Sequence, residues 1–260
     1  MIATAADGTR LHYIVEGSGP PLVLLGGKTS SIEGAWWRYI PPLAERFKVI
    51  APDNRGAGAS DKPDAPYSTS LMAEDALAVL RDAGETSAHW FGISLGGMIL
   101  QQLAVDHPDA VRSLILGATH CGGARLPTGS ADNPPGVEAP LRRYANLYDA
   151  HFIAEHPEWV EEDAKHFGKM PLHAIVAQDQ AVKQHNLCDR LSEIRQPVLI
   201  LHGRQDRMVP LARGEELQRA LPSARLEVLD PAGHQFHSEQ FRTVLRLLQD
   251  FVDEVERQRA

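Results

Sequence analysis

The sequence predicts an α/β fold with a mostly parallel central sheet, an N-terminal hairpin, helices on both faces and a helical lid insertion. Short apolar runs rich in β-branched residues alternate with helix-like segments toward both ends of the chain. Such alternation is typical of a parallel sheet covered by helices on both sides. With 260 residues and 43% hydrophobic content, the chain has enough apolar material for one large core and a lid.

The predicted strands begin at the N-terminus. Ile2–Ala5 and Arg10–Val15 are joined by Asp7-Gly8, a pair typical of a tight hairpin turn. The core strands share short aliphatic runs without strict alternation, as expected for strands buried on both faces. These strands are Leu22–Leu25, Phe47–Ile50, His89–Phe91, Leu114–Leu116, Val198–Leu201 and Leu226–Leu229.

Helices are expected between and after these strands, at Trp36–Ala44, Leu71–Ala83, Gly96–Asp106, Leu211–Ala220 and Ser238–Arg257. The middle of the chain differs, because residues 122–187 contain no convincing strand. This part opens with a Gly-, Pro- and Ser-rich stretch, and Pro140, Pro157 and Pro171 then stand where helices would start. We therefore expect core segments 1–121 and 188–260, separated by a helical lid at 122–187.

Composition excludes several classes of function. The net charge of −8 gives no basic surface for nucleic acid or an anionic membrane. The first residues do not show the basic and long apolar regions typical of a signal peptide, so we expect none. We also find no pattern of a membrane span, a P-loop or a dinucleotide fingerprint. Cys121 and Cys188 form neither a disulfide framework nor a metal-knuckle pattern. We expect a cytoplasmic monomer or homodimer in a reducing setting, with no metal and no cofactor.

The first candidate site lies in the segment His89–Met98. Here Gly92-Ile93-Ser94-Leu95-Gly96 fits the pattern G-x-S-x-G directly after a predicted strand and directly before a predicted helix. A serine on this sharp turn is held in a strained conformation, and the helix N-terminus favours a developing oxyanion. The pattern predicts that Ser94 is a nucleophile, and the alternative is a serine that only caps the helix.

A serine nucleophile needs a base, and the base needs an orienting acid. Asp206 follows the predicted strand at Val198–Leu201, and His234 follows the one at Leu226–Leu229. Loops at the carboxyl ends of parallel strands face a common crevice, which also receives the Ser94 turn. We therefore expect a triad of Ser94, His234 and Asp206.

Other residues compete for these roles. Asp230 is nearer to His234 in the sequence and is an alternative acid, which would leave Asp206 as a loop cap. His237 is an alternative base. His202 is expected to be a packed or hydrogen-bonded strand residue.

These segments resemble the α/β-hydrolase superfamily over essentially the whole core. The resemblance lies in GISLGG around Ser94, HGRQDRMVP around Asp206 and AGH ending at His234. Asp53–Ser60 is similar to the family turn D-x-R-G-x-G-x-S, which is mainly structural. Within the superfamily, the length and the lid resemble small esterases and enol-lactonases of the 3-oxoadipate enol-lactonase type. A serine at position 94, where haloalkane dehalogenases and epoxide hydrolases have a carboxylate, argues against both of those activities.

The resemblance also implies an oxyanion hole made of two backbone N–H groups. One belongs to Leu95, and the other to Lys28 or, alternatively, Gly27. Many relatives carry His-Gly after the first parallel strand, whereas this chain has Leu25-Gly26-Gly27-Lys28. A backbone donor does not depend on the side chain, so Lys28 can still donate. What anchors this loop without the histidine is left open by the sequence.

The function implied is a cofactor-independent serine hydrolase that cleaves a small to medium ester or lactone through an acyl-enzyme on Ser94. Carbon–carbon bond hydrolases and metal-free perhydrolases of the superfamily use the same triad and remain alternatives. A ligand receptor with a vestigial triad is a further alternative. Candidate substrate contacts are Trp36, His120, Tyr144, Phe152 and Trp159.

Overall fold

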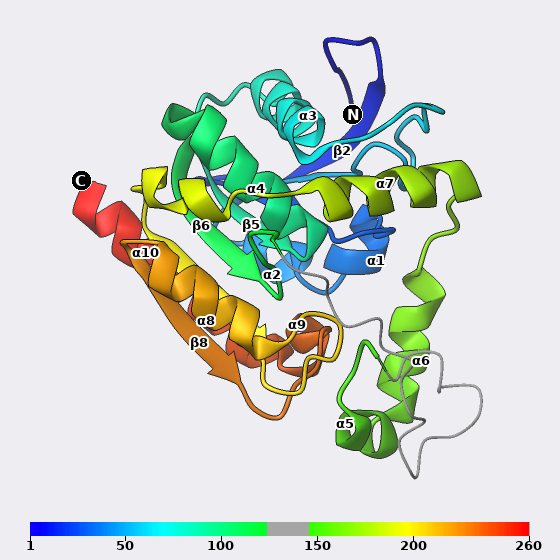
Figure 1. Ribbon diagram of the computed structural model, residues 1–260, viewed down its shortest axis with the longest axis vertical. Helices are drawn as coiled ribbons and strands as arrows, with labels where there is room; N and C mark the ends of the chain where they lie inside the picture. Colours follow the sequence, from blue (N-terminus) through cyan, green and yellow to red (C-terminus); the bar gives the residue numbers. More distant parts are fainter. Residues whose placement is uncertain (124–145, 260) are drawn as a thin grey trace.

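A computed structural model of the chain describes residues 1–123 and 146–259. An eight-stranded sheet with the order β1-β2-β4-β3-β5-β6-β7-β8 forms its centre (Figure 1). The two strands of the N-terminal hairpin form the antiparallel pairs, β1 with β2 and β2 with β4. All the other neighbouring strands pair parallel. The strands are β1 (Ile2–Thr4), β2 (Arg10–Glu16), β3 (Pro21–Leu25), β4 (Lys48–Pro52), β5 (Ala88–Ile93), β6 (Val111–Gly117), β7 (Val198–Gly203) and β8 (Ala224–Leu229). The predicted mostly parallel sheet is confirmed.

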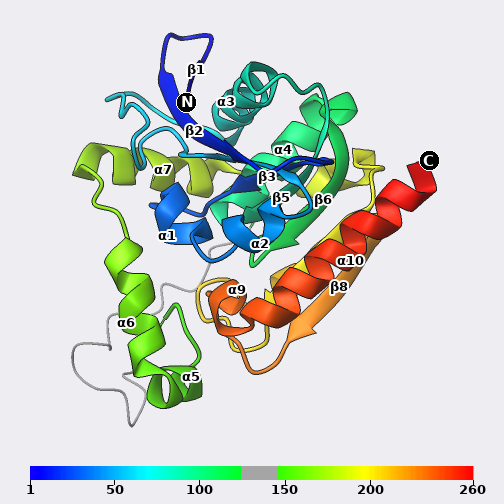
Figure 2. The same ribbon diagram turned by 180° about the vertical axis from the view of Figure 1, so that it is seen from behind.

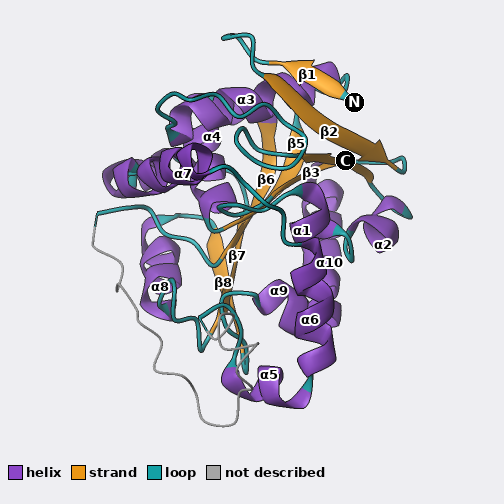
Figure 3. Cartoon of the chain, turned by 90° about the vertical axis from the view of Figure 1, so that its right-hand side faces the viewer, coloured by secondary structure: helices purple, strands orange, loops and turns teal. Residues whose placement is uncertain are grey.

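Helices cover both faces of the sheet, as predicted. Figure 3 shows α4 (Leu95–Asp106) and α8 (Leu211–Ala220) on one side and α2 (Ile40–Ala44) and α10 (Phe241–Arg259) on the other. Alternate residues of a strand point to opposite faces. Accordingly, Val23 and Leu25 of β3 pack in the first core cluster, with α3 (Thr69–Asp82) and α4. Leu22 and Leu24 pack in the second, with α2 and α10 (Figure 2).

The register of the parallel strands brings their carboxyl ends to one edge. Leu25 pairs with Gly92, Ile93 with Gly117, Gly117 with Leu201, and Gly203 with Leu229. Each strand therefore ends close to the end of its neighbour. The loops that leave β3, β5, β6, β7 and β8 consequently start along the same edge of the sheet.

Two of the predicted helices are interrupted. The segment Trp36–Ala44 contains the end of α1 (Ile32–Trp36), a turn and then α2, which has proline in its first turn. Proline lacks an N–H and is tolerated only where a helix starts, so Pro41 and Pro42 force the helix to restart. The segment Ser238–Arg257 spans α9 (Phe236–Glu239) and α10, which separate at Gln240. In the described ranges, no helix has the length and apolar character needed to cross a bilayer.

Three described helices lie between β6 and β7: α5 (Ala150–Glu155), α6 (Pro157–His166) and α7 (Leu172–Gln184). Pro157 occupies the first turn of α6, and Pro171 immediately precedes α7, close to the predicted starts. Pro140 lies outside the described residues. Figure 1 shows α7 crossing beside α4, while α6 and α5 extend away from it.

The two cysteines are joined, and this corrects the expectation that they form no disulfide. Cys121, after β6, bonds to Cys188 at the start of the 3₁₀ helix η3 (Cys188–Glu193). The same two segments also share a bridge between Gly122 and Asn186 and a hydrogen bond from Leu187 N to Cys121 O of 2.8 Å. Disulfides persist mainly in oxidising compartments, so this bond counts against the reducing setting expected from the sequence. The pairing was missed because 67 residues of sequence separate the two cysteines.

Candidate active site

Ser94 lies on the turn between β5 and α4 in a conformation that few non-glycine residues adopt. Its φ is 54° and its ψ is −114°. Such backbone strain persists only where the surroundings hold it in place. Ser94 N donates to Gly117 O (2.8 Å), and Ser94 O accepts from Thr119 Oγ1 (2.8 Å). The turn is therefore fixed from the neighbouring strand β6.

Two glycines make this turn sterically possible. A Cβ atom at Gly92 would lie 2.6 Å from the carbonyl carbon of Gly96. A Cβ atom at Gly96 would lie 2.3 Å from Leu25 O. Both distances are too short for real contacts, so the G-x-S-x-G spacing follows directly from the close packing of β5, α4 and β3.

Asp206 and His234 are brought together from the ends of β7 and β8. His234 Nδ1 lies 2.8 Å from Asp206 Oδ2, and the Asp206 side chain is fully buried. The other oxygen, Oδ1, accepts N–H groups from Met208 (2.9 Å) and Val209 (2.8 Å). These bonds leave Asp206 one orientation, and the carboxylate in turn fixes the imidazole ring of His234.

The competing residues have other surroundings. Asp230 is exposed and pairs with Arg204 at 2.5 Å, away from His234. His237 is buried, and burial together with the nearby His234 lowers its pKa to about 3. His202 is buried beside Asp206, and its Nε2 lies 2.8 Å from Val209 O.

The loop after β3 passes close to Ser94. A Cβ atom built on Gly27 would lie 3.5 Å from the Ser94 Cβ. Leu95 is the first residue of α4, and its backbone N–H is free of an intrahelical partner, as at any helix start. The two segments predicted to supply the oxyanion donors are thus adjacent.

The same loop is anchored by polar contacts that the sequence did not reveal. Thr29, with φ of 66°, donates its backbone N–H to Gln178 Oε1 (2.8 Å) on α7. The Gln178 amide then donates to Arg55 O (2.9 Å). Asn54 Nδ2 donates to Gly26 O (3.1 Å). Buried amide side chains therefore hold the loop in which this chain lacks the histidine of many relatives.

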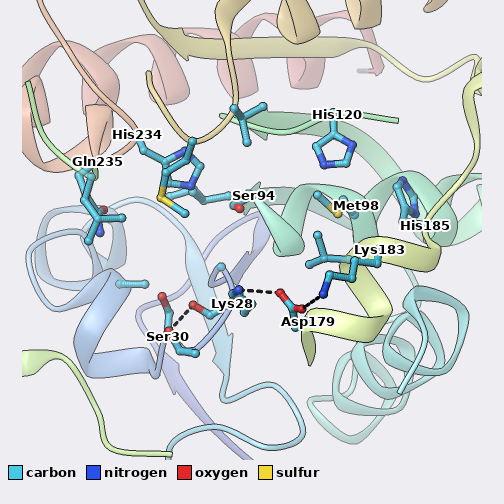
Figure 4. Close-up of a pocket in the computed structure, with 18 of the residues that line it drawn as sticks. Lys28, Ser30, Ser94, Met98, His120, Asp179, Lys183, His185, His234 and Gln235 are labelled. Carbon is cyan, nitrogen blue, oxygen red and sulfur yellow. Dashed lines mark hydrogen bonds and ion pairs between the residues drawn. The ribbon is translucent and has the colours of Figure 1, made fainter. Parts of the chain in front are cut away.

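A cavity of about 1090 Å³ opens at this edge of the sheet and is lined by both Ser94 and His234 (Figure 4). This volume suits a small to medium organic molecule. Lys28, Asp179 and Lys183 also line it and are joined by ion pairs of 3.0 Å (Lys28–Asp179) and 2.6 Å (Lys183–Asp179). In the described ranges, no cluster of side chains is suited to hold a metal ion.

Of the four predicted substrate contacts that lie in the described residues, the structure places only His120 on the wall of the cavity. The prediction that Trp36 contacts the substrate is wrong. Trp36 is fully buried and packs against Phe91 and Tyr39, because α1 turns it toward the sheet. Phe152 stacks on Tyr148.

Trp159 also makes its contacts away from the cavity. Its indole N–H donates to Ser238 Oγ (2.8 Å), and the Arg38 guanidinium lies over its ring in a cation–π contact. Tyr144 lies outside the described residues. The sequence analysis also missed His185, Asp179 and Lys183 of the cavity wall. Their position could be found only by knowing how α7 crosses the sheet edge.

Comparisons with known proteins agree with this architecture. A family model described as the alpha/beta hydrolase fold matches residues 20–150 and 175–241. A putative carbamate hydrolase, RutD, of Azorhizobium caulinodans is 30% identical over 258 residues, covering 95% of this chain and 96% of the relative. A 2-hydroxymuconate semialdehyde hydrolase of Pseudomonas sp. strain CF600 is 29% identical over 268 residues, covering 96% and 93%. The structure of an N-acyl homoserine lactone degrading enzyme matches with a TM-score of 0.84 and 30% identity, covering 96% and 100%.

Proposed function

The chain belongs to the α/β-hydrolase fold family, and from this premise we propose that it is a serine hydrolase that cleaves a small to medium ester or lactone without a cofactor. The observation that carries the proposal is that His234 lines the same cavity as the strained Ser94 and is fixed by a hydrogen bond to the buried Asp206. The similarity to a lactone-degrading enzyme supports a lactone as substrate. The cavity of about 1090 Å³ has room for a small lactone.

In the proposed reaction, Ser94 Oγ attacks the substrate carbonyl carbon while His234 Nε2 accepts the hydroxyl proton. Asp206, hydrogen-bonded to Nδ1, holds the ring and stabilises the imidazolium that forms. The backbone N–H groups of Leu95 and of Lys28 or Gly27 stabilise the oxyanion. The protonated histidine then passes its proton to the leaving alkoxide, giving an acyl-enzyme. Water, deprotonated by His234, releases the acid and restores Ser94.

One second function has support from a relative. A 2-hydroxymuconate semialdehyde hydrolase cleaves a different class of substrate and is 29% identical to this chain. A carbon–carbon bond hydrolase would use the same Ser94, His234 and Asp206. Because the two activities share these residues, substrates and not variants must separate them.

The proposal is tested by labelling with a fluorophosphonate probe, alongside turnover of p-nitrophenyl acetate, p-nitrophenyl butyrate and a panel of lactones. Wild type is expected to label and to turn over at least one of these substrates, and Ser94→Ala is expected to do neither. Ser70→Ala, an exposed serine of α3, is the matched control and should behave as wild type.

The outcomes separate the possible functions. Labelling without ester or lactone turnover, combined with cleavage of a vinylogous diketone, would replace the proposal by a carbon–carbon hydrolase. Absence of labelling in a folded protein would overturn the nucleophile itself and favour a ligand receptor.

A further inference from the structure

Two buried histidines line the cavity on the side away from the His234–Asp206 pair. In Figure 4, His120 and His185 lie beyond Ser94 as seen from His234. They are 4% and 3% exposed. In the part of the chain that the structure describes, the Nε2 atom of each ring is buried without a hydrogen-bond partner. Such atoms are rare in folded proteins, because an unpaired buried polar atom is destabilising.

The hydrogen bonds made by Nδ1 of each ring determine whether the unpaired Nε2 atom is a hydrogen-bond donor or an acceptor. Gly122 N donates to His120 Nδ1 at 2.9 Å, so Nδ1 is the acceptor and the proton of neutral His120 sits on Nε2. His185 Nδ1 is 3.1 Å from Thr69 Oγ1, which can donate or accept. His120 therefore presents an N–H donor, and His185 presents either a donor or an acceptor.

The surroundings favour an uncharged ligand group. Burial lowers the pKa of His120 to about 4 and that of His185 to about 3, so both rings are neutral at pH 7. The nearby charges of Arg213 and Glu216 pair with each other at 2.6 Å. The two lysines of the cavity wall, Lys28 and Lys183, are both paired with Asp179. A carboxylate bound at the two histidines would have to compete with Asp179 for a cation or be buried unpaired, which is unfavourable. A carbonyl or hydroxyl oxygen needs only the donor that His120 presents.

The two rings are held in place from both sides. His120 O accepts from Gln101 Nε2 (3.1 Å), and the adjoining residue Cys121 is bonded to Cys188. The Gly122–Asn186 bridge then ties the segment after His120 to the segment after His185. The ring centroids are 6.5 Å apart in an edge-on arrangement. This pair is therefore a rigid, preformed feature of the cavity wall.

We propose that His120 and His185 form a second polar subsite that binds an uncharged oxygen, a carbonyl or a hydroxyl, carried by the substrate at a distance from its scissile carbonyl. The proposal rests on the proposed function for which end of the substrate reacts. It names the substrate class as oxo- or hydroxy-substituted esters or lactones. A plain alkyl chain would leave both Nε2 atoms unpaired.

The test compares matched p-nitrophenyl esters with and without an oxo group at carbon 3, 4, 5 or 6 of the acyl chain, together with esters oxo-substituted in the alcohol. In wild type, at least one position should raise kcat/KM about 10- to 100-fold over the alkyl ester. In His120→Phe this ratio, measured for both esters on the same variant, should fall to about 1. His120→Gln, which keeps an N–H donor, should restore part of the ratio.

The control is His173→Phe, which replaces an exposed histidine of α7, the helix that ends directly before His185. This variant should keep the wild-type ratio. A wild-type ratio near 1 at every position, or a ratio that survives in both His120→Phe and His185→Phe, would overturn the subsite. Should His120→Phe not fold, His120→Leu, which also lacks a side-chain N–H donor, replaces it in the comparison. Failure of the proposed function shows itself separately, as loss of labelling and of plain ester turnover in wild type.

Discussion

At the candidate site, the chemistry that a residue can perform depends more on its neighbours than on its residue type. Ser94 is one of three non-glycine residues with positive φ in the described chain, and β6 holds it there through Gly117 and Thr119. Asp206 and Asp230 are both aspartates at the carboxyl end of a strand. Only Asp206 is buried against a histidine, whereas Asp230 faces solvent and Arg204.

This difference gives a prediction for the two aspartates. Asp206→Asn should lower kcat by about 10⁴, because an amide facing Nδ1 holds His234 in the wrong tautomer. Asp230→Asn should stay within about twofold of wild type, since it affects only exposed contacts, an ion pair with Arg204 and a hydrogen bond from Gln205. Steady-state kinetics on one ester, with circular dichroism to check folding, decides the matter. Equal losses in both variants would argue against Asp206 as the orienting acid.

At the scale of elements, helix α7 supports the core as well as covering it. Its Gln178 is fully buried and connects Thr29 N with Arg55 O, so it spans the loop after β3 and the loop after β4. Asp179, the next residue, holds the side chain of Lys28. The loop that is proposed to supply an oxyanion donor is thus positioned by α7.

Gln178→Ala should therefore lower kcat by about 10- to 100-fold with little change in KM, because a loosened donor stabilises the transition state more than the substrate. Gln180→Ala, an exposed residue of the same helix, is the matched control and should be neutral. Fluorophosphonate labelling, which also forms an oxyanion, should slow in parallel with kcat. A change confined to KM would mean that Gln178 shapes the cavity and does not position the loop.

The elements were predictable from the sequence to different degrees. The core strands were predicted because fully buried strands leave continuous aliphatic runs. The break between α1 and α2 was missed, although Pro41 and Pro42 mark it, because apolar spacing continues across it. The Cys121–Cys188 bond was missed because it depends on the path of residues 122–187, which sequence spacing does not determine.

The same reasoning applies to the site. Ser94, Asp206 and His234 could be selected because each comes within five residues after the end of a predicted strand, and parallel strands share one carboxyl edge. Trp36 was misplaced because an apolar side chain on a short helix suits a cavity wall and a core equally well. Gln178 lies on α7, and His185 directly follows it. Their contacts with the site could not be predicted from the sequence because they depend on where α7 packs.

For the whole molecule, the number of buried neutral histidines affects stability at low pH. Burial lowers the pKa of His120 to about 4 and that of His185 and His237 to about 3. In the unfolded chain a histidine titrates near 6.5, so the unfolded state binds protons first as the pH falls. Their contribution to stability is therefore complete above about pH 6.5 and is lost as the pH falls toward 4.

Two buried acids oppose this trend, Asp75 and Glu239, because burial raises the pKa of each carboxyl. Burial raises the pKa of Glu239 to about 8, so its folded-state proton is retained across the whole range from pH 7 to pH 5. In the unfolded chain this group is ionised above about pH 4.5, and acidification therefore favours the folded state at this position. Burial also lowers the pKa values of His89 and His202, which adds them to the three histidines above. Five histidines against two acids leave a net loss of stability on acidification.

We therefore predict that the free energy of unfolding is lower at pH 5 than at pH 7, with about 1–2 kcal/mol lost per buried histidine before the opposing contributions of Asp75 and Glu239. His237→Phe should reduce this pH dependence by the share of one histidine, because the ring it replaces no longer takes up a proton on unfolding. His151→Gln, at an exposed position, should leave it unchanged. Urea unfolding followed by tryptophan fluorescence at both pH values measures the difference. A pH dependence identical in His237→Phe and wild type would mean that His237 takes up its proton equally in the folded and unfolded states.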